Sequence, residues 1–152
     1  MARLKNVTMA FFNGLLVDAG PLVALLNAND AAHATCTAIA KELPQPLLTT
    51  WIVLAEAAWL LQRTTEGPLR LLRLVEGGVV SCPELDSRAP TAMAAYLQKY
   101  SDLKPQLADV SLLYLAERER ISSVFTLDRR DFSVYRTQQN QPLVLLPSAR
   151  LP

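Results

Sequence analysis

Short apolar runs and longer mixed segments follow one another along this chain. The first such run, residues 15–17, is uninterrupted and ends on Asp18, and the Gly20-Pro21 pair then opens a second apolar segment. This pattern is typical of a buried strand that leads into a helix. Asp18 is therefore predicted at the carboxyl end of a strand, the edge of an open α/β sheet where ligands bind. The alternative is that Asp18 only caps the helix.

The same order continues to the C-terminus. Further short runs rich in apolar residues predict strands at 47–50, 79–82, 123–127 and 142–147. Longer segments with helical spacing or helix-forming composition predict helices at 31–43, 51–62, 68–76, 87–100 and 107–117. Alternating strands and helices indicate a parallel sheet with crossover helices, so we expect a three-layer α/β/α domain with about four to five short strands.

Composition narrows the class of protein. The chain has 152 residues, the size of one domain, and 51% of them are hydrophobic, which indicates a compact globular protein. Fifteen basic and fourteen acidic residues give a net charge of +1, so any contact with nucleic acid requires a local basic patch. Cys36 and Cys82 lie far apart without metal-ligand spacing, and we interpret them as reduced thiols.

The N-terminal residues are consistent with a globular protein of this class. Arg3 and Lys5 precede an apolar stretch, but Asn13 and Asp18 interrupt it, so neither a signal peptide nor a membrane span is predicted. We expect a cytoplasmic protein that makes no membrane contact. Residues 9–152 are expected to form the single domain, with residues 1–8 as an extension that is disordered or not native, because Met9 offers a second start.

Glu56 is the acidic residue whose position is hardest to account for by a purely structural role. It is the only polar side chain between residues 51 and 61. Its helical neighbours three and four positions away are Ile52, Val53, Trp59 and Leu60. A carboxylate buried among them without a partner costs several kcal/mol or becomes protonated. Its partner is either an Arg or Lys from elsewhere in the chain or a bound cation.

Asp109 and Asp128 raise the same question. Asp109 lies at the start of an apolar helix, where it either complements the helix dipole or faces a ligand site. Asp128 follows a predicted strand, where it either caps a short helix or faces the same ligand site. Two carboxylates 4 Å apart repel by about 4 kcal/mol at an effective dielectric constant of about 20. A cluster of them therefore favours a hard divalent cation, Mg²⁺ or Mn²⁺, and such ions support phosphodiester hydrolysis.

Four segments carry a family resemblance. They are LVDAGPLVALL at 16–26, LTTWIVLAEA at 48–57, LADVSL at 107–112 and VFTLDRRDF at 124–132. In this order and spacing the chain resembles the PIN domain family, the PilT N-terminus nucleases that include the virulence-associated protein C toxins. The matching segments span nearly the whole chain.

The resemblance implies a PIN-like parallel sheet flanked by helices, with a Mg²⁺- or Mn²⁺-dependent ribonuclease site at its carboxyl edge. The family's acidic quartet falls on Asp18, Glu56, Asp109 and Asp128. A further acidic metal position falls on Asp131, and a hydroxyl position falls on Thr126. Gln106 departs from the pattern, because many members have Asp there, and this neutral residue is expected to weaken binding of a second metal ion. The resemblance also implies a homodimer and a small antitoxin partner.

Arg129 and Arg130, beside Asp128, are candidate substrate contacts through RNA phosphates, together with Thr126; the alternative is that the two arginines are merely solvated. His33 is expected at the surface rather than as a general base.

We therefore predict a metal-dependent endoribonuclease, the toxin of a toxin–antitoxin pair. The alternative is a catalytically weak PIN-like module that binds RNA or protein. A receiver-type phosphoacceptor domain fits less well, because the paired acids and the lysine that it needs are missing at the predicted strand ends.

Overall fold

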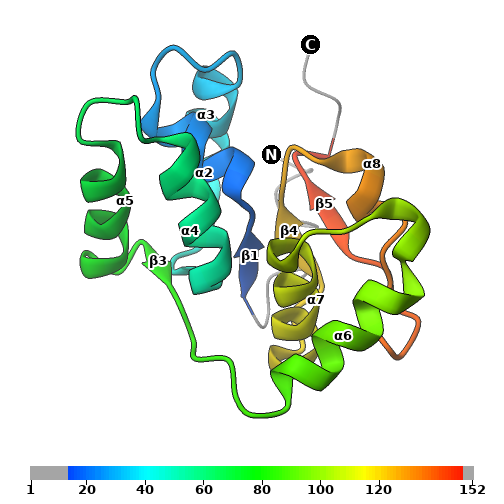
Figure 1. Cartoon of the computed structure of the whole chain (residues 1–152). Helices are drawn as coiled ribbons and strands as arrows, with labels where there is room; N and C mark the ends of the chain where they lie inside the picture. Colours follow the sequence, from blue (N-terminus) through cyan, green and yellow to red (C-terminus); the bar gives the residue numbers. More distant parts are fainter. Residues whose placement is uncertain (1–13, 149–152) are drawn as a thin grey trace.

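The computed structural model describes residues 14–148, so the extension predicted at residues 1–8 and the start at Met9 lie outside the described residues. Five short strands form one sheet (Figure 1): β1 (Leu15–Val17), β2 (Leu47–Leu48), β3 (Val80–Ser81), β4 (Ser123–Phe125) and β5 (Val144–Leu146). Helices connect them: α2 (Ala19–Leu26), α3 (His33–Glu42), α4 (Trp51–Leu60), α5 (Gly67–Glu76), α6 (Ala89–Lys99), η1 (Ser101–Leu103), α7 (Leu107–Glu119) and α8 (Arg129–Phe132). None of the helices within residues 14–148 has the length and hydropathy needed to cross a bilayer.

The sheet is parallel throughout, with the strand order β3-β2-β1-β4-β5. Val17 of β1 lies opposite Phe125 of β4, so these two strands end together. The chain builds outward from β1 on one side and from β4 on the other, and in open α/β sheets the crevice at such a switch point is the ligand site. The order also differs from the 2-1-3-4-5 order of receiver-type domains, which removes that alternative.

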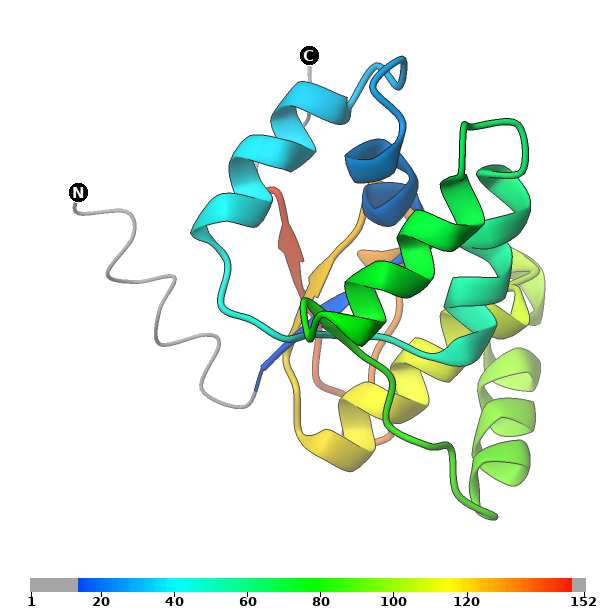
Figure 2. The ribbon, with the colours of Figure 1, turned by 90° about the vertical axis from the view of Figure 1, so that its left-hand side faces the viewer.

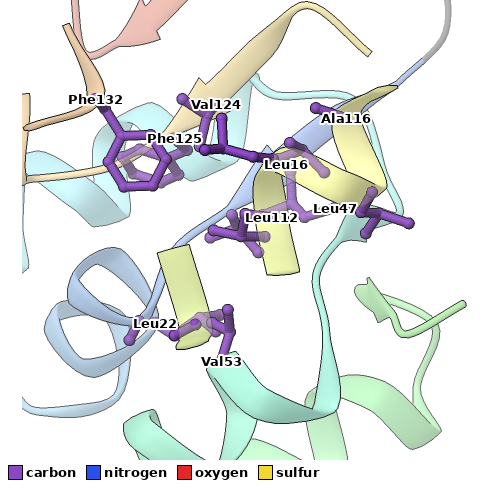
Figure 3. Packing of buried hydrophobic residues seen from close by; sticks show 14 of the residues in the cluster. Leu16, Leu22, Leu47, Val53, Leu112, Ala116, Val124, Phe125 and Phe132 are labelled. Atoms are coloured by element: carbon purple, nitrogen blue, oxygen red, sulfur yellow. The ribbon is translucent and has the colours of Figure 1, made fainter. Parts of the chain in front are cut away.

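Helices cover both faces of the sheet. All three residues of β1 are buried, as expected for a parallel strand packed on both sides. In Figure 2, α3 lies on one side of the strands and α4 and α7 on the other, with α6 outside α7. Figure 3 shows Leu16 and Val124 of the sheet packed with Leu112 of α7. The predicted three-layer α/β/α fold is confirmed.

Two hydroxyl side chains mark the early end of one predicted strand. The strand predicted over 47–50 ends at Leu48. Thr49 Oγ1 donates a hydrogen bond to the carbonyl oxygen of Val17 (2.8 Å), and Thr50 Oγ1 accepts one from the backbone N–H of Val53 (3.2 Å). Thr50 is thus the N-cap of α4, and the chain turns away from the sheet at that point.

The predictions for the two cysteines and for the histidine have different outcomes. Cys36 and Cys82 are both free thiols, as expected. The expectation of a surface His33 is only partly right: the residue is half-buried, and its Nδ1 lies 2.7 Å from the carbonyl oxygen of Ala24. The histidine therefore ties the start of α3 to α2.

Candidate active site

Asp18 and Asp128 lie where β1 and β4 end. Asp18 follows β1 directly and caps α2, since its Oδ1 accepts a hydrogen bond from the backbone N–H of Ala19 (2.8 Å). Asp128 caps α8 in the same way, through the backbone N–H of Asp131 (3.2 Å). The capping interpretation and the sheet-edge interpretation of these residues therefore both hold. Capping leaves the carboxylates at the switch point.

Thr126 connects the two strand ends. Its Oγ1 donates a hydrogen bond to Asp18 Oδ2 (2.9 Å) and accepts one from the backbone N–H of Asp128 (3.0 Å). The hydroxyl is buried, so these two contacts fix the position of the Asp18 carboxylate relative to β4.

Asp109 comes from α7 and is held by two donors. Its Oδ2 accepts hydrogen bonds from the backbone N–H of Gln106 (3.1 Å) and from the hydroxyl of Tyr135 (3.3 Å). Tyr135 is fully buried and packs edge to face against Tyr100 and Phe132. No sequence pattern marks Tyr135 as a site residue, because a contact across 26 positions leaves no local signal.

Glu56, on α4, is half-buried rather than enclosed. The expectation that apolar side chains bury it is therefore only partly right. Its neighbour Trp59 is 68% exposed, and Leu60 is 54% exposed. Within residues 14–148 no ion pair involves Glu56, so the lysine or arginine partner considered above is not present there.

The structure brings all the predicted acidic residues together around one pocket of about 390 Å³. Its acidic lining residues are Asp18, Glu56, Asp109, Asp128 and Asp131. Lys104, which no sequence pattern marked, and Gln106 also line this pocket. None of the ion pairs formed within residues 14–148 includes any of the five carboxylates. We call this cluster the acidic pocket.

The electrostatics of the acidic pocket follow from this crowding. The pKa of Asp18 is raised from 3.8 to about 6, mainly by burial and to a smaller extent by the nearby Glu56 and Asp128, while the hydrogen bonds from Ala19 and Thr126 act in the opposite direction. The pKa of Asp109 is likewise raised to about 6, mainly by burial and to a smaller extent by Asp18 and Asp128. The pKa of Glu56 is raised by partial burial and by Asp109. The site therefore favours either protons or a cation.

The donors suit a hard divalent cation, because they are all carboxylate oxygens. As the side chains stand, no three acidic, histidine or cysteine residues within the described part of the chain are grouped closely enough to hold an ion. Ion binding therefore requires the side chains to turn toward one another, which mutual repulsion opposes in the absence of a cation.

The three candidate substrate contacts occupy different environments. Thr126 is buried against Asp18, as described above. The Arg129 guanidinium is half-buried and donates a hydrogen bond to the carbonyl oxygen of Pro147. Arg130 is exposed. His33 is not among the residues that line the acidic pocket.

The fold and the site define an α/β protein with a carboxylate pocket at the switch point of a parallel sheet. No protein-family model matches the chain. Ribonuclease VapC26 of Mycobacterium tuberculosis is 27% identical to it over 124 residues, which cover 80% of this chain and 92% of that protein. The crystal structure of VapC20 from the same organism, a Sarcin-Ricin loop cleaving toxin, matches with a TM-score of 0.67 at 19% identity, over 73% of this chain and 87% of that chain. The predicted resemblance to the virulence-associated protein C proteins of the PIN domain family is confirmed.

Proposed function

We propose that this protein is an endoribonuclease that hydrolyses RNA phosphodiester bonds at the acidic pocket, and that it is the toxin of a toxin–antitoxin pair. The observation that carries the proposal is the convergence of five carboxylates, without an ion-pair partner among residues 14–148, at the switch point of the sheet. The names of the two relatives, a ribonuclease and an RNA-cleaving toxin, support the same activity.

Asp18, Glu56, Asp109, Asp128 and Asp131 would hold Mg²⁺ or Mn²⁺ in this proposal. A divalent ion bound there would supply a water of lowered pKa and stabilise negative charge on the leaving oxygen.

The chain's other residues fix the carboxylates. Thr126 and the backbone N–H of Ala19 orient Asp18, while Tyr135 and the backbone N–H of Gln106 orient Asp109. No serine, cysteine or histidine is needed as a nucleophile. The neutral Gln106 is proposed to favour one ion over two.

The proposed assembly is a cytoplasmic homodimer that an antitoxin protein inhibits. Exposed apolar side chains on α4 and α5, namely Trp51, Trp59, Leu69 and Leu72, support a protein interface on this part of the surface. Sedimentation velocity of wild type and of Trp59→Ala tests the dimer. A wild-type monomer at all concentrations is the contrary outcome.

The activity is tested by calorimetry with Mn²⁺ and Mg²⁺ beside cleavage of a mixed pool of structured RNAs. Asp18→Asn is the active-site variant, and Glu84→Gln is the charge-matched control, because Glu84 is exposed in the loop between β3 and α6. We expect wild type and Glu84→Gln to bind metal and cleave RNA, and Asp18→Asn to do neither.

Two other results are informative. Metal binding without cleavage of any RNA favours the alternative of a catalytically weak binding module. Absence of metal binding at millimolar concentration contradicts the proposed carboxylate site itself.

A further inference from the structure

A second pocket lies directly beside the acidic pocket. Its volume is about 700 Å³, and it shares Leu127 and Asp128 with the acidic pocket. Leu145 and Pro147, from β5 and the residue after it, form part of its wall. Figure 1 shows β5 and α8 next to each other at this end of the sheet. The volume is within the range of about 300–1,000 Å³ that is usual for small-ligand sites.

Two arginines from α8 line this second pocket. The hydrogen bond from Arg129 to the carbonyl oxygen of Pro147 fixes that guanidinium against the wall and uses one of its five N–H donors. Arg130 is exposed, and its guanidinium takes part in none of the ion pairs or hydrogen bonds formed within residues 14–148. The pocket thus combines one fixed cation with one available cation.

The two arginines offset a repulsion between the RNA substrate and the carboxylates of the acidic pocket. An RNA strand carries negative charge on each phosphate, and the five carboxylates of the acidic pocket repel it. The net charge of the protein is only +1, so attraction must come from basic groups close to the site. Arg129 and Arg130 are such groups, one shared wall away from the carboxylates.

We infer that the second pocket binds the RNA nucleotide adjacent to the bond that is cut, with Arg130 at its phosphate and the leucine and proline side chains against its sugar and base. This inference rests on the proposed ribonuclease function. Arg129 holds the wall formed by Pro147, and Leu127 and Asp128, which line both pockets, lie between the bound nucleotide and the other four carboxylates.

The test is the affinity of a short fluorescein-labelled single-stranded RNA of mixed sequence, measured by fluorescence anisotropy over a range of KCl concentrations with Ca²⁺ in place of Mn²⁺. The variants are Arg130→Ala and Arg130→Lys. Arg73→Ala is the matched control, because Arg73 is also exposed and lies in the part of α5 that leads to β3. Arg130 and Arg73 are both exposed, and the surface ion pair between Arg73 and Glu76 contributes little to stability, so the thermal unfolding midpoints of all variants are expected to stay close to that of wild type.

Arg130→Ala is expected to weaken RNA binding about fivefold to tenfold and to reduce the slope of log K against log salt by about 0.7, the value for one phosphate contact on a single strand. Arg130→Lys keeps the charge and is expected to keep the slope. If Arg130→Ala binds RNA with the same affinity and salt slope as Arg73→Ala, the inference about the second pocket is overturned. In that case the proposed ribonuclease function still stands, provided that wild type cleaves RNA. Wild type that neither binds nor cleaves RNA overturns both.

Discussion

Replacing Asp18 by Asn is expected to stabilise the metal-free protein at neutral pH. The Asp18 side chain is only 7% exposed, and burial raises its pKa from 3.8 to about 6. Above this pH the folded protein must hold an ionised carboxylate in surroundings that favour the protonated form. Asn has the same shape without the charge, and like Asp it is a good helix N-cap.

The size of the effect follows from the pKa. A shift of about two pH units corresponds to about 3 kcal/mol of free energy of unfolding. In the variant, Thr126 loses the carboxylate oxygen to which its hydroxyl donates, which costs about 1 kcal/mol. The net gain of about 2 kcal/mol raises the thermal unfolding midpoint of a domain of this size by about 4–8 °C. Removal of the Asp18 charge also relieves its repulsion of Asp109, which acts in the same direction.

The sign of the pH dependence distinguishes this account from a purely structural role. Because the pKa of Asp18 is higher in the folded state, its contribution to stability is complete below about pH 4 and is lost as the pH rises through about 6. Circular dichroism melts in EDTA should therefore show Asp18→Asn above wild type at about pH 8, and the order should reverse at about pH 4. A variant that melts below wild type by the same amount at both pH values would refute the reasoning.

Three further results are expected. Tyr135→Phe removes a hydrogen bond to Asp109, so Mn²⁺ affinity measured by calorimetry falls about tenfold in a folded protein; unchanged affinity contradicts this. Mn²⁺ affinity decreases below about pH 6, because protons compete for Asp18 and Asp109; a flat pH profile is the contrary outcome. Gly67→Ala lowers the free energy of unfolding by about 2 kcal/mol in chemical denaturation, because its Cβ would lie 2.4 Å from the carbonyl oxygen of Leu61; a wild-type denaturation midpoint argues against this.

Local sequence was sufficient for the part of the site that sits at strand ends. An apolar run that ends on a carboxylate predicts both a buried strand and the position of Asp18 or Asp128, and parallel strands bring such positions to one edge. The family resemblance assigned Glu56 and Asp109 to the same carboxyl edge of the sheet, and in the structure both line the acidic pocket there.

The remaining features depend on contacts between distant segments. Tyr135 and Lys104 reach the site from loops, and no periodicity marks them. The exposure of Trp59 was not predicted, because α4 is apolar around nearly its whole circumference and the sequence does not say which side other elements cover. Strand β2 ends early because Thr50 caps helix α4. This capping outweighs the β-propensity of Thr49 and Thr50, which had extended the predicted strand to residue 50.

The N-caps at Asp18 and Asp128 have a consequence for how such a protein can lose its activity. The carboxylates that line the acidic pocket also begin helices α2 and α8, and Asn or Ser performs that local task about as well as Asp. A single substitution can therefore erase the charge while every helix still starts at the same residue. A chain with Asn at both positions would therefore keep this architecture while two of the five carboxylates proposed to hold an ion are gone.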